Sequence, residues 1–362
     1  GAPVSPVVLG RMTDMLTHRG PDDRGTHVDG GLGLGHRRLS IIDLTAAGHQ
    51  PIATPDGRFV LSYNGEVYNF AELRTELESA GFRFRSRTDS EVVLYAFAHW
   101  GLAAVDRFNG MFALALWDTS ERRLHLIRDR YGIKPLYFTH VGGALLFGSE
   151  AKAFLAHPDF APRVSTAGLV EYMTFQNCFT DNTLLEGVRV VEPGTIMTFS
   201  EGNETPEVRR YWDYAFAEPE GHASEADLTE ELDRLFTQAV NRQLVSDVPV
   251  GAYLSGGIDS GSITAVAAQQ LPLMSTFTVG FDLNSASGIE LAFDERASAE
   301  HMSYLFRTQQ YEMVLKAGDM ERAMRQLVWH IEEPRVGQSY PNYYAARLAS
   351  RFAKVVLAGT GG

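Results

Sequence analysis

Apolar and polar positions alternate over short runs in the first two hundred residues, and this pattern predicts β-strands. The runs occupy residues 32–44, 59–63, 111–117, 124–128 and 144–147. Gly-containing pairs such as Asn64-Gly65 separate them and indicate turns. Two helical patterns interrupt the strands, at 70–80 and at 90–100. We therefore expect an α+β layered domain over residues 1–200, with sheet packed on sheet and helices outside.

A polar segment, 201–223, contains two prolines and is interpreted as a linker. Ser224 then begins a helix, with Asp227 three residues later in a capping-box pattern. Further along, strands at 248–254, 275–281 and 354–358 alternate with helices at 262–271, 293–306, 320–330 and 343–352. This alternation predicts a second, α/β domain over 224–362 with a parallel, doubly wound sheet. Ligands of such sheets bind at the carboxyl ends of the strands.

Composition narrows the functional classes. The chain has 362 residues, enough for two domains, and a formal net charge of −13. This acidic balance argues against a general nucleic-acid or membrane-surface binder. No apolar run approaches the ~20 residues that span a bilayer. The single cysteine, Cys178, excludes an internal disulfide, so a reducing cytoplasm is the default compartment.

A glycine loop follows the strand at 248–254. Its sequence is Ser255-Gly256-Gly257-Ile258-Asp259-Ser260, and a helix with small residues comes next. A strand–loop–helix turn of this kind aims backbone N–H groups and a helix N-terminus at one point, which suits phosphate. The sequence is not a Walker loop, which requires Gly-Lys-Ser/Thr at its end. An ordinary glycine-rich turn of an α/β domain is the alternative.

The first half carries blocks of charged and polar residues that suggest a site for a zwitterion. They are HRGPD (18–22), GHRRLS (35–40), YNGEVYN (63–69), RTDSE (87–91), RDRYGIKPLY (128–137) and FGSE (147–150). An arginine can hold a carboxylate, an aspartate can bind an ammonium group, and Asn64-Gly65 offers both donors of an oxyanion hole. The structural alternatives are a surface position for Arg38, a helix cap for Asp89 and a hairpin turn for Asn64-Gly65. Structural ion pairs are expected for Arg128, Asp129, Arg130 and Lys134, and ordinary packing or surface roles for His36 and His49.

Together these blocks resemble the class II (N-terminal nucleophile) glutamine amidotransferase domain. Joined to SGGIDS, they resemble glutamine-hydrolysing asparagine synthetases over essentially the whole chain. The resemblance implies an Ntn-type αββα glutaminase followed by a parallel-sheet ATP-pyrophosphatase domain.

The resemblance also assigns site residues. Arg38 matches the arginine that binds the glutamine carboxylate, Asn64 and Gly65 match the oxyanion hole, and Glu66 and Asp89 match the residues that hold the glutamine amino end. ATP would be held by Leu254, Ser255, Gly256, Gly257, Asp259, Ser260, Val279, Ala358 and Gly359. Asp259 would also help to hold Mg²⁺.

The implied reaction uses glutamine, aspartate and ATP. Glutamine hydrolysis releases ammonia, which attacks an aspartyl-adenylate and yields asparagine, glutamate, AMP and pyrophosphate. One alternative is a relative that amidates another carboxylic acid or forms a lactam, and another is a non-catalytic glutaminase-like module. The oligomeric state is left open, with a homodimer among the alternatives.

Two departures from the family pattern affect these expectations. The family nucleophile is an N-terminal cysteine, whereas this sequence begins Gly1-Ala2-Pro3 and Cys178 is interior. We expect that the natural chain begins about ten residues earlier and continues beyond Gly362, because the strand at 354–358 ends in a glycine loop. Thr360 stands where the family often has an acidic residue, which leaves the choice of acceptor acid open.

Overall fold

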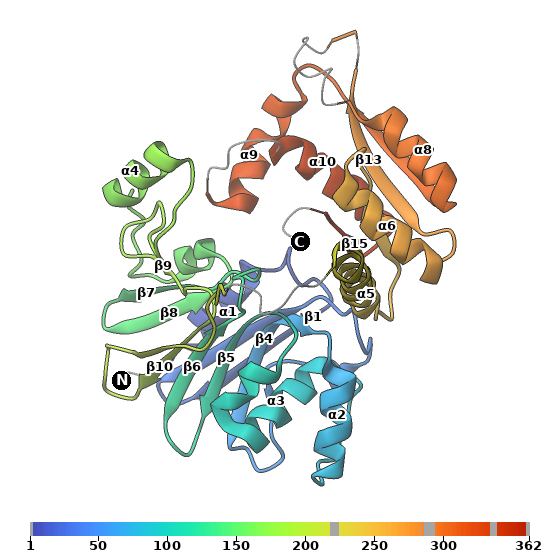
Figure 1. Ribbon diagram of the computed structural model, residues 1–362. Helices are drawn as coiled ribbons and strands as arrows, with labels where there is room; N and C mark the ends of the chain where they lie inside the picture. The colour runs from blue at the N-terminus through green and yellow to red at the C-terminus, as the bar shows by residue number, and fades with distance from the viewer. Residues whose placement is uncertain (1–2, 218–223, 283, 286–293, 334–338, 360–362) are drawn as a thin grey trace. The chain divides into compact units, whose positions relative to one another are not determined.

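The computed structural model describes residues 3–217, 224–282, 284–285, 294–333 and 339–359 (Figure 1). The chain divides into two compact units, Gly1–Phe216 and Ala217–Gly362. Each unit has its own sheets and its own hydrophobic core.

The first unit is built mainly from strands. Its strands are β1 (Asp23–Asp29), β2 (Leu32–Arg38), β3 (Ile52–Ala53), β4 (Phe59–Val67), β5 (Gly110–Asp118), β6 (Arg123–Arg128), β7 (Tyr137–Val141), β8 (Ala144–Gly148), β9 (Arg189–Val190), β10 (Thr195–Ser200) and β11 (Glu207–Arg210). Its helices are α1 (Pro6–Asp14), α2 (Phe70–Ser79), α3 (Asp89–Trp100) and α4 (Thr166–Phe175), with 3₁₀ turns η1 (Ala46–Gly48), η2 (Gly101–Arg107) and η3 (Ala151–Ala156).

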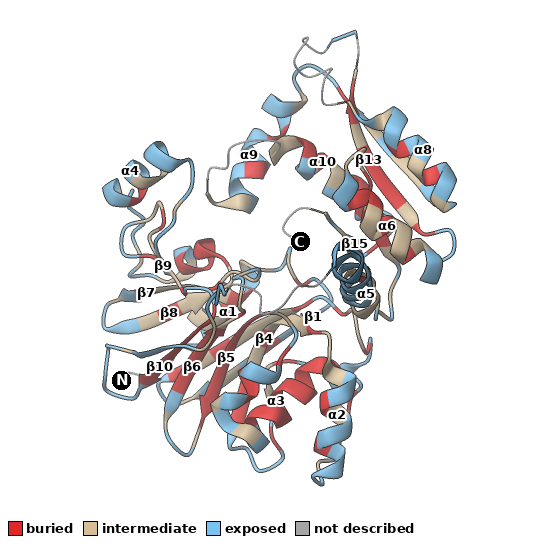
Figure 2. Cartoon of the chain, in the orientation of Figure 1, coloured by how far each residue is buried: buried red, intermediate tan, exposed pale blue. Residues whose placement is uncertain are grey.

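A six-stranded antiparallel sheet, in the order β11-β10-β6-β5-β4-β3, is the centre of the first unit. One face of this sheet packs against α2 and α3, and the buried side chains of both helices join those of β4 and β5 in one apolar cluster (Figure 2). Alternate residues of each strand point to opposite faces, so the same strands also present a second apolar face. Val60, Ala113, Leu126 and Met197 belong to the cluster on that side.

The second face is covered by two smaller sheets. One is the hairpin β1-β2 and the other has the order β8-β7-β9. Behind them, Met12 of α1 and Phe154 of η3 pack with Leu146 of β8. The resulting order of layers is helices, large sheet, small sheets and then helix, which confirms the predicted αββα arrangement.

Several predicted boundaries of the first unit are wrong. The strand expected at 32–44 ends at Arg38, because the chain then bends around the Arg38 guanidinium. Asn64-Gly65 is not a turn, since both residues lie inside β4 and pair with Ala113 and Phe112 of β5. The segment 201–223 was interpreted as a linker, but it carries β11, which pairs with β10 at the edge of the large sheet.

The second unit is an α/β domain. Its strands are β12 (Val250–Tyr253), β13 (Ser275–Phe281), β14 (Gln309–Leu315) and β15 (Val355–Leu357), and its helices are α5 (Glu225–Arg242), α6 (Ile258–Gln270), α8 (Arg296–Phe306), α9 (Asp319–Ile331) and α10 (Ser339–Ala349). The strands form one parallel sheet in the order β14-β13-β12-β15. This topology confirms the parallel sheet predicted from the alternation of strands and helices.

Successive side chains of β13 point to opposite faces of this sheet. Phe277 and Phe281 pack toward α10, whereas Thr276 lies on the other face and bonds Thr308, just after α8. The predicted capping box at the start of α5 is confirmed: Ser224 Oγ accepts the N–H of Asp227, and the Asp227 carboxylate accepts the N–H of Ser224. Strand β14 was not predicted, because its alternation is weak and only its last residue, Leu315, is buried.

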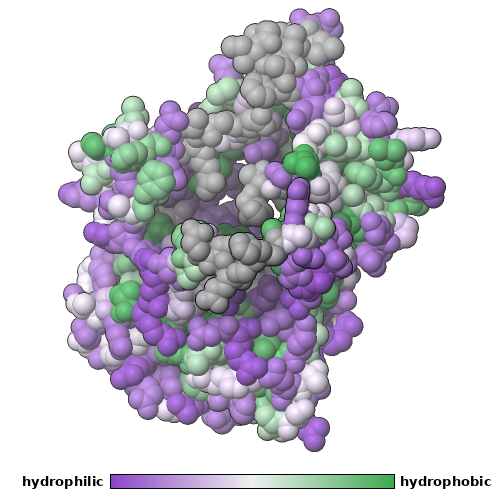
Figure 3. Space-filling model, in the orientation of Figure 1, coloured by the Kyte–Doolittle hydropathy of each residue, from purple (hydrophilic) through white to green (hydrophobic). Residues whose placement is uncertain are grey.

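One helix of the first unit contributes little to its core. On α4, Leu169, Val170, Met173 and Phe175 are all exposed, and only Gly168 is buried. Apolar side chains gather over this part of the surface in Figure 3. The stability of the first unit therefore depends on the packed layers around the large sheet rather than on α4.

Candidate functional site

A cavity of about 840 Å³ lies in the first unit, between the large sheet and the small sheets. Its lining comes from α1, β2, β4, β5, β8, the start of α3 and the loop between β6 and β7. The five residues predicted from sequence to hold a zwitterion and an oxyanion all line it, namely Arg38, Asn64, Gly65, Glu66 and Asp89. The structure thus brings together residues that are up to 51 positions apart in the chain.

Strand β4 carries the centre of the site. Asn64 and Glu66 are two residues apart and therefore share the face of β4 that is directed toward the cavity. Gly65 lies between them, directly opposite Phe112 of β5. A Cβ at Gly65 would overlap the backbone carbonyl oxygen of Met111, so only glycine allows the two strands to pair at this point. The Asn64 amide donates to Ser149 Oγ at 3.4 Å, which aims it toward β8.

Asp89 is held at the first residue of α3 and is 6% exposed. Its Oδ2 accepts two hydrogen bonds, from Tyr63 Oη at 2.7 Å and from the backbone N–H of Val67 at 3.0 Å. Burial raises the pKa of Asp89, although these hydrogen bonds lower it in part. The alternative that Asp89 caps the helix is wrong, because the cap is Thr88, whose Oγ1 accepts the N–H of Glu91.

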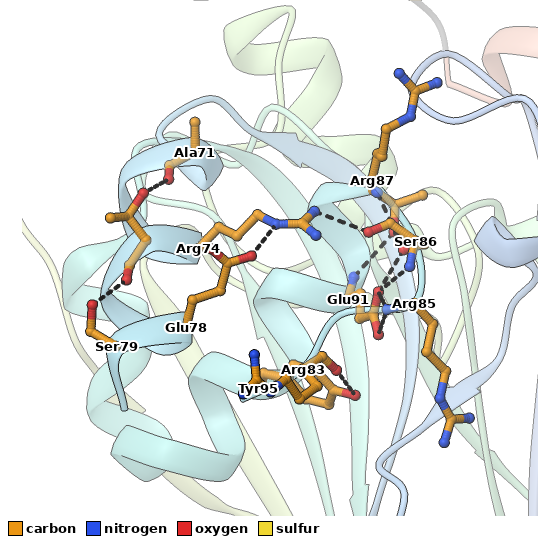
Figure 4. Close-up of polar contacts among 12 residues, drawn as sticks. Ala71, Arg74, Glu78, Ser79, Arg83, Arg85, Ser86, Arg87, Glu91 and Tyr95 are labelled. Atoms are coloured by element: carbon orange, nitrogen blue, oxygen red, sulfur yellow. Dashed lines mark hydrogen bonds and ion pairs between the residues drawn. The ribbon is translucent and has the colours of Figure 1, made fainter. Parts of the chain in front are cut away.

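The loop before α3 is ordered by the buried carboxylate of Glu91 (Figure 4). This carboxylate accepts the backbone N–H groups of Arg85 and Ser86 and the hydroxyl of Ser86. Arg74 of α2 donates to the carbonyl of Ser86 at 3.0 Å, which ties the same loop to the neighbouring helix. Asp89 therefore has a position set by side chains that are not part of the cavity.

Arg38 is 7% exposed, so the alternative of a surface arginine is wrong. Its guanidinium donates to the backbone carbonyls of Thr45 at 2.9 Å, Ile42 at 3.1 Å and Asp43 at 2.5 Å. Gly48 lies against the same guanidinium, and a Cβ there would overlap it. The loop after β2 is thus wrapped around Arg38, which fixes the position of this charge in the cavity wall.

A hydrogen bond joins this loop to the start of α3. The Asp43 carboxylate accepts the backbone N–H of Arg87 at 2.8 Å and the Thr45 hydroxyl at 2.6 Å. These bonds, led by that from Arg87, lower the pKa of Asp43. The loop that holds Arg38 and the start of α3 that carries Asp89 are consequently joined by one connected network.

Glu66 is a carboxylate of the site with an unpaired oxygen atom in the described part of the chain. Its Oε1 is buried and has no hydrogen-bond partner among the described residues. Burial, together with repulsion from Asp89, raises the pKa of Glu66 to about 7, and the ammonium of Lys134 opposes that rise. At neutral pH this carboxylate is close to half ionised and lacks a donor, which suits it to receive a positively charged group of a ligand.

Sequence reasoning missed two residues of the cavity. Lys134 was expected in an ion pair, but no carboxylate of the described residues lies within ion-pair distance of its ammonium, and its side chain lines the cavity. His36 also lines the cavity, where Nδ1 contacts Ser62 Oγ at 3.4 Å and burial lowers the pKa of the imidazole to about 4. The signal available in the sequence was their place inside the polar blocks 35–40 and 128–137.

The HRGPD block lies beside the cavity. Glu150 binds His18, Arg19 at 2.9 Å and Lys152 at 2.5 Å. Burial alone would raise the pKa of Glu150, but its hydrogen bonds with Lys152, Arg19 and His18 lower it. Asp22 accepts the backbone N–H of Ser40 at 2.8 Å, so the block also anchors the chain just after β2.

In the second unit the glycine loop connects β12 to α6. Ser260 Oγ accepts the backbone N–H of Ser255 at 3.1 Å and contacts Ser255 Oγ at 2.8 Å, and Ser255 Oγ accepts the N–H of Gly257 at 3.1 Å. Gly257 is the N-cap residue of α6, and Asp259 lies in the first turn. The loop is closed by its own hydroxyls, and its helix N-terminus provides a positive end for an anion.

The other residues predicted to hold ATP lie on neighbouring strands of the same sheet. β12 pairs with β13, which carries Val279, and with β15, which Ala358 and Gly359 follow. A Cβ at Gly359 would lie 2.8 Å from the backbone nitrogen of Ser260, so Gly359 directly adjoins the loop. Thr360 lies outside the described residues.

Comparisons with known proteins agree with this division. The family described as a glutamine amidotransferase domain matches residues 4–212, and the family described as asparagine synthase matches residues 231–362. One solved structure, glutamine phosphoribosylpyrophosphate amidotransferase from B. subtilis, covers 86% of this chain with a TM-score of 0.45 and 14% identity, the match extending over 64% of that chain.

Curated relatives match most of this chain. Asparagine synthetase [glutamine-hydrolyzing] 3 of Bacillus subtilis is 37% identical over 92% of this chain, and asparagine synthetase [glutamine-hydrolyzing] 1 of the same organism is 34% identical over 98%. A putative asparagine synthetase of Mycobacterium tuberculosis is 36% identical over 98%. The chain spans about half the length of these relatives, 54%, 54% and 55%. The chain belongs to the family described as a glutamine amidotransferase domain, which matches more than half of its residues, and its second segment matches the family described as asparagine synthase.

Proposed function

We propose that the protein makes asparagine from aspartate with ATP, using ammonia released from glutamine. The observation that carries this proposal is the convergence of Arg38, Asn64, Gly65, Glu66 and Asp89 on one cavity. A buried guanidinium and two carboxylates that line the same cavity suit the two charges of an amino-acid head group. The names of the curated relatives support glutamine hydrolysis and the formation of asparagine.

The chemistry assigned to the first unit is hydrolysis of the glutamine amide. Arg38 would hold the α-carboxylate, and Glu66 with Asp89 would hold the α-ammonium. The Asn64 side chain and the N–H of Gly65 would stabilise the oxyanion that forms when the amide carbon is attacked. This arrangement concentrates the binding charges at the head group and leaves the neutral amide beside the oxyanion donors.

The nucleophile has a place in the same cavity. Cys178 does not line it, and 840 Å³ is more than one amino acid needs. We propose that the thiol nucleophile that the family resemblance implies would attack the glutamine amide in this cavity.

The second unit would activate aspartate as an acyl-adenylate. Ser255, Gly256, Gly257 and Ser260 would bind the pyrophosphate, while Leu254, Val279, Ala358 and Gly359 would contact the nucleoside. Mg²⁺ is commonly held by one or two carboxylates together with phosphate oxygens, so Asp259 beside the loop fits such a role. The ion would neutralise the departing pyrophosphate.

The experiment measures AMP formation by the full-length protein from ATP and Mg²⁺, with ammonium or glutamine, in the presence and absence of aspartate. We expect aspartate-dependent AMP with either nitrogen source. Arg38→Lys should reduce the glutamine-driven rate at least tenfold and leave the ammonium-driven rate unchanged, since ammonium bypasses the cavity. Arg24→Lys, on the neighbouring strand β1, is the matched control and should change neither rate.

If AMP formation depended on a different acid, that acid and not aspartate would be the acceptor substrate. Absence of AMP with every acid tested would disprove the synthetase activity. If Arg38→Lys lowered both rates equally, the proposed role of the cavity in glutamine binding would be wrong.

We further propose that the protein acts in the cytoplasm as a homodimer. The absence of an internal disulfide supports the compartment, and no helix in the described part of the chain has both the length and the apolar character to cross a membrane. Sedimentation of the full-length protein would test the assembly: a monomer at micromolar concentration would contradict it.

A further inference from the structure

Lys134 lies in a loop whose backbone is fixed from both sides. Asp129 accepts the backbone N–H groups of Ile133 at 3.0 Å and Lys134 at 2.9 Å. The Arg128 guanidinium donates to the carbonyl of Lys134 at 2.8 Å and to that of Gly132 at 2.7 Å. The loop therefore has little freedom, and it presents the Lys134 side chain to the cavity.

Lys134 and Glu66 form a pair of opposite charges that do not touch. Both line the cavity, and each interacts electrostatically with the other without an ion pair among the described residues. Burial lowers the pKa of Lys134, repulsion from Arg19 lowers it further, and attraction to Glu66 and Asp129 opposes both effects. A separated pair of this kind leaves room for a ligand group next to the carboxylate.

The other groups that face Glu66 do not help it to ionise. Asp89, at the start of α3, is a carboxylate and repels it. Tyr63 and Tyr68 interact with Glu66, and burial raises the pKa of both phenols, so neither carries a charge at neutral pH. Directly opposite Glu66, β5 places the apolar Met111. Among the described groups, Lys134 is the cation whose charge favours ionised Glu66.

We propose that Lys134 is a positioning residue for ligand binding in this cavity: its ammonium favours the ionised form of the Glu66 carboxylate, so that Glu66 can accept the ammonium group of a bound amino acid. The inference rests on the proposed function of the cavity as a glutamine site. Without Lys134, Asp89 is the charge that acts on Glu66, and the carboxyl group keeps its proton to a higher pH. A protonated carboxyl group no longer attracts the ligand's ammonium.

The first experiment compares Lys134→Met and Lys134→Arg with the unchanged full-length protein. Methionine keeps the apolar stem in the cavity wall, whereas arginine keeps the charge. We measure kcat and KM for glutamine hydrolysis between pH 6 and pH 9. For Lys134→Met we expect the KM for glutamine at pH 6.5 to rise about tenfold for each unit by which the pKa of Glu66 increases. The difference in KM from the unchanged protein should vanish near pH 9, and kcat should change little. Lys134→Arg should restore most of the affinity.

A second readout does not require activity. The ¹³C-labelled carboxyl resonance of Glu66, identified by its loss in Glu66→Gln, is titrated in both proteins. We expect a midpoint near pH 7 in the unchanged protein and a higher midpoint in Lys134→Met. If Lys134→Met fails to fold, as judged by circular dichroism, Lys134→Gln replaces it.

The outcomes separate this inference from the proposed function. An unchanged Glu66 midpoint, a KM increase of the same size at every pH, or an equal loss in Lys134→Arg would overturn the role of Lys134. Failure of the unchanged protein to hydrolyse glutamine would count against the proposed function instead, and the midpoint shift would still decide whether Lys134 controls Glu66.

Discussion

The cavity of the first unit and the glycine loop of the second present their functional groups in different ways. The cavity collects side chains from β2, β4, the start of α3 and the β6–β7 loop. The loop takes its groups from the stretch between Ser255 and Ser260, and its own hydroxyls close it. One site is assembled by the packing of layers, and the other is a local structure at the end of a strand.

This difference predicts how each site responds to damage. A group in the cavity keeps its position through residues that are distant in the chain, such as Glu91 for Asp89 and the carbonyls after β2 for Arg38. A substitution that removes one of these supporting contacts should therefore reduce the function and the stability of the first unit together. A change inside the glycine loop should instead impair nucleotide use with little loss of stability.

The largest expected effect comes from Gly65→Ala. The added methyl group would overlap the Met111 carbonyl, and since both atoms belong to paired strands no side-chain rotation can relieve the clash. We expect the free energy of unfolding to fall by about 3 kcal/mol and glutamine-dependent activity to be lost. Urea unfolding and the glutaminase assay measure both. Gly148→Ala on β8 is the control for the stability measurement, because its Cβ would meet its nearest neighbour at 3.6 Å. A Gly65→Ala protein as stable as the unchanged one would contradict the assembled-site view.

Glu66→Gln should separate function from stability in the cavity. The folded pKa of Glu66, about 7, lies above the unfolded value of 4.5, so the folded state retains the proton and its stability falls as the pH rises from 4.5 to 7. Replacement should leave stability unchanged near pH 4 and raise it by about 2 kcal/mol at pH 8, after allowance for partial solvation. Glutamine KM should rise. Thermal unfolding at both pH values is the measurement, with Glu207→Gln on the exposed strand β11 as control. An equal gain in stability at both pH values would show that ionisation of Glu66 does not destabilise the folded state.

Ser260→Ala tests the local character of the loop. The change removes the acceptor for the Ser255 N–H and the contact with the Ser255 hydroxyl. We expect about a tenfold loss in kcat/KM for ATP, a change in unfolding free energy below about 1 kcal/mol, and unchanged glutamine hydrolysis. Ser262→Ala, in the same helix α6, is the matched control. Unfolding of the second unit caused by Ser260→Ala would show that this loop is also a packing element.

The smallest effect is expected for Ser224→Ala. This substitution removes the N-cap of α5 and the hydroxyl half of its capping box. The second unit should lose about 1 kcal/mol of stability, while both activities remain. Ser224→Thr should retain most of the stability, because threonine also caps helices. A loss of ATP-dependent activity without a loss of stability would place α5 closer to the nucleotide site than its cap role implies.

Contiguous patterns carried most of what the sequence determined. Strand β13 has the bounds predicted from its apolar run, and the Ser224 cap was visible as two residues three apart. The glycine loop could be located because its donors are neighbours in the chain. Local chemistry of this kind depends on nearby residues, so it is readable without the fold.

Only the tertiary structure showed which contacts form between residues that are far apart in the sequence. Arg38 resembles an exposed arginine in sequence, and only the loop from Ile42 to Gly48 buries it. Asn64-Gly65 has the composition of a hairpin turn, yet pairing with β5 keeps both residues extended within β4. Lys134 was expected in an ion pair, but the fold fixes its backbone and directs its side chain into the cavity instead. The physical reason is common to all three: burial and the partners of a charge are set by the elements packed against it, and those elements are far away in the sequence.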